Sequence, residues 1–132
     1  MKISACVIAK NEAENLPRWL ASMRVFADEM IVVDTGSTDA TVQIADAGGA
    51  KVFHFAWIND FAAAKNFALD KASGDWVVFT DADEYFTEES VSRVRPLIEE
   101  YSQKKNFDGC LLQEQAGARG PKGRHIAQAG EG

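Results

Sequence analysis

The sequence has 132 residues, of which 46% are hydrophobic and 26% are charged, and its net charge at pH 7 is −6. This composition is that of one ordinary globular domain, and its acidic balance argues against nucleic acid as the main partner. The apolar run near the N-terminus is too short to cross a membrane and lacks a cleavage pattern, so we expect a cytoplasmic protein without a transmembrane segment.

Strand and helix patterns alternate from the first residues onward. Residues 3–9 are apolar apart from Ser4, which predicts a buried strand. Pro17 then stands in the first turn of a predicted helix, where proline is tolerated. The apolar face of that helix has helical spacing and consists of Leu16, Trp19, Leu20 and Met23. Residues 30–33 predict a second buried strand, which ends at Asp34.

The middle of the chain repeats this alternation. A turn with helix-capping residues, 35–39, precedes a short helix that two glycines stop near Ala47. A third strand is predicted over 51–55. Asp60 can cap the next helix, which runs to Ala72 and is expected to turn its apolar residues Phe61, Ala64, Ala68 and Leu69 toward the core.

The last predicted elements begin with a continuous apolar run, Trp76 to Phe79, which is typical of a strand buried on both faces. A helix should start at Thr87, and Pro96 is expected to bend or break it. Residues 107–112 could form a fifth strand. The alternation predicts an α/β fold with a mainly parallel, doubly wound, Rossmann-like sheet. The turn after the first strand has no glycine fingerprint, so a dinucleotide cradle is not supported.

Three acids follow the apolar run within four residues: Asp81, Asp83 and Glu84. Ligands of open α/β sheets bind at the carboxyl ends of the strands, and carboxylates two residues apart on extended backbone point the same way. Two neighbouring carboxylates repel each other unless a cation neutralises them. Carboxylate oxygens are hard ligands, which bind Mg²⁺ or Mn²⁺ together with phosphate oxygens of a substrate. The pattern indicates a metal-assisted diphosphate site; the alternative is a solvated acidic loop that caps the next helix.

Four segments, in this order and spacing, resemble the nucleotide-binding half of family 2 glycosyltransferases, which have the GT-A fold. They are Ile-Ala-Lys-Asn-Glu-Ala-Glu-Asn-Leu (8–16), Ile-Val-Val-Asp-Thr-Gly-Ser-Thr-Asp (31–39), Ala-Lys-Asn-Phe-Ala-Leu (64–69) and Trp-Val-Val-Phe-Thr-Asp-Ala-Asp-Glu (76–84). The resemblance spans about residues 2–90. It implies a GT-A αβα sandwich, incomplete at the C-terminus, that transfers a sugar from a nucleotide-diphosphate donor, commonly a UDP-sugar, with Mn²⁺ or Mg²⁺.

The resemblance also implies roles for individual residues. Asp34 would accept the imide N–H of uracil, and Glu12 would line the nucleoside pocket. Lys65 stands where the family usually has arginine, near the base and the diphosphate, and lysine supplies a point charge without the bidentate fork. Asp81 and Asp83 would form the DxD motif, with Asp81 toward ribose and diphosphate and Asp83 on the metal.

Each role has a structural alternative. Asp34 could cap the turn after its strand, Glu12 could be a charge in the first turn of a helix, and Lys65 could be a solvated lysine. His54 is expected to be structural, and Trp57 and Phe61 are expected in the core or at its rim. Cys6 and Cys110, which lie far apart without a CxxC, are expected to be small buried side chains in a reducing compartment.

The C-terminal segment departs most from the family. Residues 114–132 are rich in glycine and poor in large apolar side chains, so we expect a body of residues 1–113 followed by a flexible or truncated tail. A truncated or frame-shifted gene would produce such an end. No residue has the context of a catalytic base, so the catalytic residue is unknown.

Three functions remain open. The first is a glycosyltransferase acting on an unknown acceptor, whether glycan, lipid or protein. The second is a non-catalytic nucleotide- or metal-binding fragment that needs a missing C-terminal half or a partner. The third is a haloacid dehalogenase-type phosphohydrolase, whose DxD also follows an apolar strand; that motif normally opens its fold, whereas here three predicted strands precede it.

Overall fold

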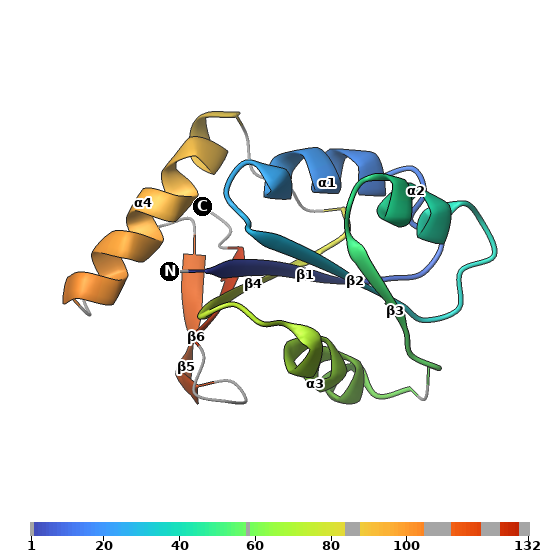
Figure 1. Cartoon of the computed structure of the whole chain (residues 1–132). Coiled ribbons are helices and arrows are strands. Elements are labelled where there is room, and N and C mark those ends of the chain that lie inside the picture. Colours follow the sequence, from blue (N-terminus) through green and yellow to red (C-terminus); the bar gives the residue numbers. More distant parts are fainter. Residues whose placement is uncertain (1, 58, 84–87, 105–111, 120–124, 130–132) are drawn as a thin grey trace.

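The computed structural model describes residues 2–57, 59–83, 88–104, 112–119 and 125–129. Strands and helices alternate as the hydrophobic pattern predicts, and two further strands follow the last helix (Figure 1). The elements are β1 (Ile3–Ala9), α1 (Leu16–Arg24), β2 (Glu29–Asp34), α2 (Thr41–Ala47), β3 (Lys51–His54), α3 (Phe61–Lys71), β4 (Trp76–Asp81), α4 (Glu88–Lys104), β5 (Leu112–Arg119) and β6 (His125–Ala129).

The described strands form a single sheet in the order β3-β2-β1-β4-β6-β5. All neighbouring pairs are parallel except β5 with β6, which are antiparallel. The chain first adds strands on one side of β1, and then crosses back to place β4 on its other side. This reversal is the switch point of a doubly wound sheet, and it confirms the predicted α/β, mainly parallel fold.

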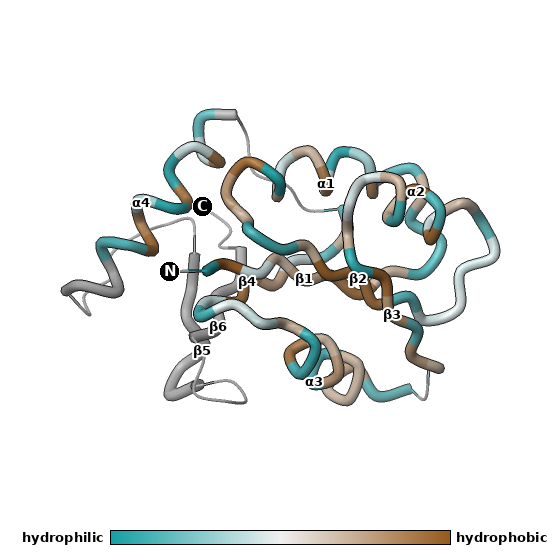
Figure 2. Tube along the Cα trace, viewed as in Figure 1, coloured by the Kyte–Doolittle hydropathy of each residue, from teal (hydrophilic) through white to brown (hydrophobic). Residues whose placement is uncertain are grey.

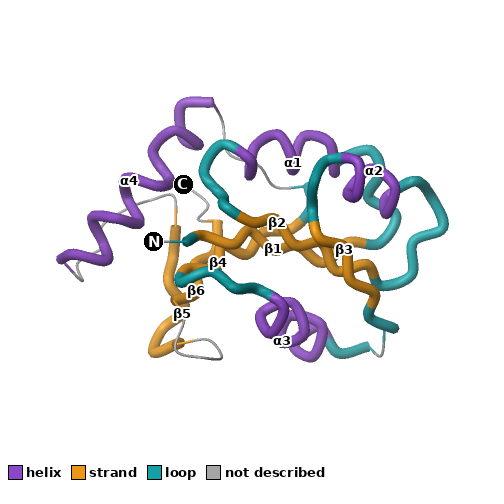
Figure 3. Tube along the Cα trace, viewed as in Figure 1, coloured by secondary structure: helices purple, strands orange, loops and turns teal. Residues whose placement is uncertain are grey.

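Helices cover both faces of the sheet (Figures 1 and 3). Helices α1 and α2 lie on one face and α3 on the other. Because successive side chains of a strand point to opposite faces, the core divides into two clusters. Val32, Val78 and Trp19 belong to the cluster on the α1 side, which α4 also joins, whereas Val33 and Phe79 belong to the cluster under α3. The central strands are accordingly the most apolar part of the trace (Figure 2).

Two predictions about helices need correction. The sequence predicts that Pro96 bends or breaks its helix, but α4 continues through Pro96, so the helix is not broken there. A proline costs the helix one hydrogen bond, and the burial of Val91, Val94 and Ile98 along one face of α4 stabilises the helix on both sides of it. Phe61 is 50% exposed and is not part of the core, because it is the first residue of α3 and the buried part of this helix begins at Ala64.

The other local signals have the expected outcome. The carboxylate of Asp60 accepts a hydrogen bond from the Ala63 amide at 3.0 Å and caps α3. Cys6 is buried as expected, while Cys110 lies outside the described residues. In the part of the chain that the structure describes, no helix is both long enough and apolar enough to cross a membrane.

In the C-terminal segment, where the sequence predicts a flexible or truncated tail after residue 113, strands β5 and β6 extend the sheet beyond β4. Main-chain groups of β6 pair with the otherwise open side of β4, from Trp76 opposite His125 to Phe79 opposite Gln128. Strand pairing uses backbone groups and does not need large apolar side chains, so a glycine- and alanine-rich segment can add to a sheet edge. The predicted strand over 107–112 lies outside the described residues except for Leu112.

Candidate functional site

Acidic residues from two strands meet at the carboxyl edge of the sheet, on either side of β1. Asp34, the last residue of β2, is the register partner of Ala9, and Asp81, the last residue of β4, is the partner of Ile8. Asp83 follows Asp81 by two residues. Asp34 thus ends one strand and Asp83 follows another, and both strands end at one edge of the sheet, with β1 between them. This edge includes the switch point between β1 and β4, where open α/β sheets bind ligands.

The carboxylate of Asp34 organises the turn that follows β2. Its Oδ2 accepts hydrogen bonds from the amides of Gly36 and Ser37, both at 3.2 Å, and its Oδ1 accepts the Ser37 hydroxyl. Gly36 has a φ of +122°, a conformation that favours glycine. Because two carboxylate oxygens offer about four lone-pair sites, the turn leaves room for roughly one further donor. Asp34 therefore does cap the turn, as the structural alternative predicts. Its carboxylate can still accept about one more hydrogen bond.

His54 is a neighbour of Asp34 that the sequence analysis treated as structural. The two residues are register partners on β2 and β3, and His54 Nδ1 lies 3.6 Å from Asp34 Oδ2. The imidazole is 69% exposed, whereas the carboxylate is 5% exposed. His54 is thus the solvent-facing neighbour of a buried acid. The signal that could have found it is the position of both residues at the ends of adjacent parallel strands.

Polar side chains join the loop after β1 to the loop after β2. The amide of Asn11 donates to Ser37 Oγ at 2.9 Å, and Asn11 Oδ1 accepts the Thr38 amide at 2.7 Å. The amide of Glu12 donates to Thr41 Oγ1 at 2.9 Å. Glu12 itself is half-buried and its Oε1 accepts from Asn15 Nδ2 at 3.4 Å. This network holds Glu12 in the loop that lies beside the Asp34 turn.

Lys65 lies on the α3 face of the sheet, on the same side as Asp81. Its ammonium is 5.2 Å from the centre of the Phe79 ring, and Phe79 and Asp81 are two residues apart on β4. Burial lowers the pKa of Lys65 below its usual value. Lys65 is therefore half-buried against β4 and not the freely solvated lysine of the structural alternative.

Asp34 and Asp81 belong to opposite faces of the sheet. Alternation puts Asp34 on the face of Val32 and Asp81 on the face of Phe79, so the end of β1 lies between them. A ligand that touches both must lie across the carboxyl end of β1. A nucleotide has this shape, because its base and its diphosphate are separated by the ribose.

The acid pair fits a hydrated cation better than a closed metal cage. Asp81 and Asp83 are both exposed. In the described part of the chain, no group of three or more histidine, cysteine or acidic side chains is arranged to hold a metal. Mg²⁺ is usually held by one or two protein carboxylates and completes its coordination with water and phosphate oxygens. The residues present therefore suit a cation that arrives with a phosphorylated ligand.

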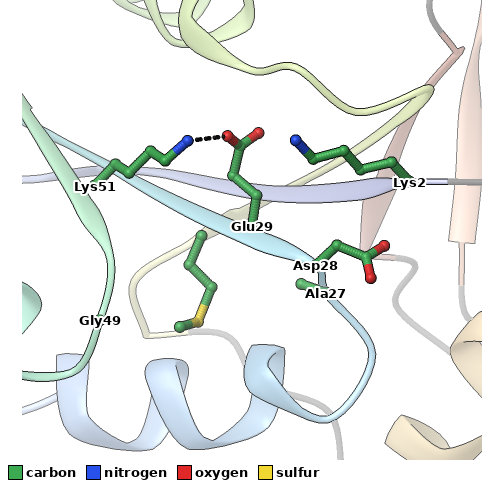
Figure 4. A pocket seen from close by; sticks show the side chains of 7 residues that line it. Lys2, Ala27, Asp28, Glu29, Gly49 and Lys51 are labelled. Atoms are coloured by element: carbon green, nitrogen blue, oxygen red, sulfur yellow. Dashed lines mark hydrogen bonds and ion pairs between the residues drawn. The ribbon is translucent and has the colours of Figure 1, made fainter.

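A pocket of about 170 Å³ lies at the opposite, amino edge of the sheet (Figure 4). Its carboxylates and ammonium groups come from Lys2, Asp28, Glu29 and Lys51. Glu29 binds Lys51 at 2.7 Å and the Ser4 hydroxyl at 2.6 Å, so its charge is already neutralised within the protein. We assign this pocket to structure, because it lies far from the strand ends where the acids of β2 and β4 converge.

The family described as Glycosyl transferase family 2 matches residues 4–120. The chain is 46% identical over 99 residues to a TPR repeat-containing protein of Synechococcus elongatus, covering 75% of this chain and 25% of that protein. It is 39% identical over 104 residues to an uncharacterized glycosyltransferase of Rickettsia bellii, and the match covers 79% of this chain and 35% of that protein. The chain thus spans about a quarter to a third of the length of these relatives.

Two solved structures share the fold. The structure of S. aureus TarS 1–349 in complex with UDP-GlcNAc has a TM-score of 0.65 and 29% identity, and the similarity covers 77% of this chain and 32% of that one. Glucosyl-3-phosphoglycerate synthase from Mycobacterium tuberculosis, solved with Mn²⁺, UDP and glucosyl-3-phosphoglycerate, has a TM-score of 0.57 and 25% identity, covering 84% and 42%.

Proposed function

Because the chain belongs to glycosyl transferase family 2, we propose that it binds the nucleotide of a nucleotide-sugar donor, of the UDP type, for transfer of the sugar to an acceptor. The observation that carries the proposal is the convergence of Asp34 and Asp81 on either side of β1 at the switch point of the sheet. The TarS complex with UDP-GlcNAc supports the choice of donor, because it pairs this fold with that class of ligand.

We assign the base to the Asp34 side of the site. The carboxylate would accept the imide N–H of uracil with the lone pair that its turn leaves unused, and the half-buried Glu12 would line the nucleoside pocket. On the Asp81 side, the ammonium of Lys65 would face the diphosphate, and its contact with Phe79 would keep it near the end of β4.

A divalent cation, Mn²⁺ or Mg²⁺, would be held by Asp83 and the donor's phosphates, with Asp81 toward the ribose and diphosphate. Such a cation would neutralise the diphosphate and stabilise the negative charge that develops on it when the sugar leaves. Without it, two carboxylates would face two phosphates, which is an unfavourable arrangement of like charges. The Mn²⁺ complex of the mycobacterial synthase supports a divalent ion in this fold.

Calorimetric titration with UDP tests the proposal. We expect UDP to bind in the presence of Mn²⁺ and its affinity to fall by about tenfold or more in chelator. Asp83→Ala should remove this metal-dependent gain, and binding in chelator should not weaken, because one of the carboxylates that repel the phosphates is gone. Equal UDP affinity in Mn²⁺ and chelator would contradict the metal–diphosphate role.

A second pair of variants tests the base contact. Asp34→Asn should weaken uridine and UDP by similar factors, because it turns part of the acceptor into a donor at the proposed imide contact. Ser37→Ala is the matched control, since it removes a turn contact of Asp34 while the carboxylate stays. If Ser37→Ala weakens uridine as much as Asp34→Asn does, the effect comes from the turn and the proposed base contact is wrong.

A second candidate function is binding of a nucleotide and metal without transfer. It is favoured by the acids that the structure describes at the strand ends, Asp34, Asp81 and Asp83, none of which has the context of a catalytic base. The acceptor, whether glycan, lipid or protein, belongs to the first candidate only. Turnover separates the two, as described below.

A further inference from the structure

A buried hydrogen bond links helix α1 to the strand end that carries the acids. The indole Nε1 of Trp19 donates to Thr80 Oγ1 at 2.5 Å. Trp19 is fully buried and Thr80 is 3% exposed. An indole N–H can only donate, so it needs an acceptor wherever it is enclosed. Thr80 is the polar residue of an otherwise apolar stretch of β4, and it immediately precedes Asp81.

A second contact joins the same turn of α1 to the other end of the acidic segment. The guanidinium of Arg18 lies 3.5 Å from the carbonyl oxygen of Asp83. The same Nη2 atom lies 3.5 Å from Asn15 Oδ1, at the start of the helix. Consecutive residues of α1 therefore contact the first and last residues of the segment Thr80–Asp83.

These contacts act on the side of β4 opposite to Asp81. Thr80 lies on the face of Val78 and Ala82, toward α1, whereas Asp81 lies on the face of Phe79. A strand residue anchored on one face cannot rotate or slide without carrying its neighbour with it. Octahedral cations such as Mg²⁺ tolerate little displacement of their ligands, so a fixed strand end matters for binding one.

We propose that Trp19 is a positioning residue, which holds the Thr80–Asp83 segment through Thr80, with Arg18 in support, in the geometry that a divalent cation and a diphosphate require. The inference rests on the proposed function, because it assigns the cation to Asp83. A purely structural role for the same hydrogen bond would lower the stability of the protein without a selective effect on metal-dependent binding.

The test compares Thr80→Val, which is nearly isosteric and lacks the acceptor, with Thr80→Ser, which keeps it. Trp19→Phe removes the donor from the other side and serves as a second variant. Ser4→Ala is the matched control. It removes a buried hydrogen bond of 2.6 Å from the Ser4 hydroxyl to Glu29, near the start of β1 and thus at the opposite edge of the sheet. For each variant, thermal unfolding is followed by circular dichroism, and UDP affinity is measured by calorimetry with Mn²⁺ and with chelator.

We expect Thr80→Val and Trp19→Phe to bind UDP about tenfold more weakly than the parent in the presence of Mn²⁺. In chelator, their UDP affinity should equal that of the parent, so that the Mn²⁺-dependent gain in affinity is reduced. Thr80→Ser and Ser4→Ala should keep the gain, even where Ser4→Ala lowers the unfolding temperature as much as Thr80→Val does. A Thr80→Val protein with the full gain overturns the inference, and so does an equal loss in Ser4→Ala. If the unaltered chain binds UDP without a Mn²⁺-dependent gain, the metal–diphosphate role on which the inference rests is wrong, and the titration of the unaltered chain shows this before any variant is made.

Discussion

At the scale of single residues, Glu29 is an acidic side chain that the protein almost completely encloses. It is the first residue of β2, and its side chain is 3% exposed. Its carboxylate accepts hydrogen bonds from the Lys51 ammonium, the Ser4 hydroxyl, and the amide and hydroxyl of Ser73. Burial by itself would raise the pKa of Glu29, but these hydrogen bonds outweigh it and lower the pKa to about 2. Glu29 thereby joins the beginnings of β1, β2 and β3 to Ser73, two residues after the end of α3, and Figure 4 shows its ion pair with Lys51.

The first prediction concerns Glu29→Gln. Because the folded-state pKa lies below the unfolded value of 4.5, the charged carboxylate stabilises the protein above pH 4.5, and this stabilisation disappears as the pH falls toward 2. The variant should be less stable than the parent by about 1–3 kcal/mol at neutral pH, and the difference should close between pH 4.5 and 2. Urea denaturation of both proteins across this range measures it. A difference that stays constant down to pH 2 would contradict the assignment.

At the scale of elements, the loops after β1 and β2 behave as one unit with α1 and α2. Asp39 accepts hydrogen bonds from the amide of Thr41, at 3.0 Å, and from the amide of Ala13, at 3.2 Å, so it serves both loops. The hydrogen bond from the Thr41 hydroxyl, together with those from the two amides, lowers the pKa of Asp39 below its usual value. The strand ends on the Asp34 side of the site are thus held by side chains within the protein, which favours a base pocket that exists before the ligand arrives.

The C-terminal strands differ from the central ones in what stabilises them. β1 lies between two strands and under helices on both faces, whereas β5 is the last strand of the sheet and pairs on one side only. Residues 112–119 and 125–129 hold few large apolar side chains, so their pairing gains little from burial.

This difference predicts the pattern of amide exchange. Amides of β1 should exchange at least about a hundredfold more slowly than those of residues 112–129, because opening of β5 and β6 exposes little apolar surface. Hydrogen–deuterium exchange followed by mass spectrometry resolves the two regions. Comparable protection in β1 and in residues 112–129 would show that the C-terminal segment is a full part of the core, against the division at residues 113 and 114.

At the scale of the whole molecule, the question is whether a chain that binds a donor also transfers its sugar. We predict binding without efficient turnover, because an inverting transfer needs a base to deprotonate the acceptor hydroxyl and no acid that the structure describes at the site has the context of such a base. Release of UDP from a panel of UDP-sugars, with Mn²⁺ and with water or simple sugars as acceptors, measures this. Rapid release that disappears in Asp83→Ala would show that the transferring group lies within the chain and would exclude the binding-only candidate.

Much of this architecture could be predicted from the sequence, since it depends on local patterns. Apolar runs that end in polar residues located the four parallel strands β1 to β4 to within one or two residues, and Asp60 located the start of α3. Because βαβ units place all carboxyl ends of parallel strands at one edge, the same patterns also placed Asp34 and Asp81 together. The spacing of the acids indicated a metal-assisted diphosphate site, and the family resemblance added that the diphosphate belongs to a nucleotide-sugar.

Other features depend on which elements become neighbours, and only the tertiary structure decided them. His54 became a neighbour of Asp34 through the register of β2 with β3. Trp19 read as an ordinary core residue of a helix, and its hydrogen bond to Thr80 exists because α1 packs over the end of β4, 61 positions further along the chain. The strands β5 and β6 join the sheet through backbone pairing, which leaves no periodic trace in the side chains. Local patterns record how each segment buries its own apolar face, whereas contacts between polar side chains are set by the strand order and the packing of the whole chain.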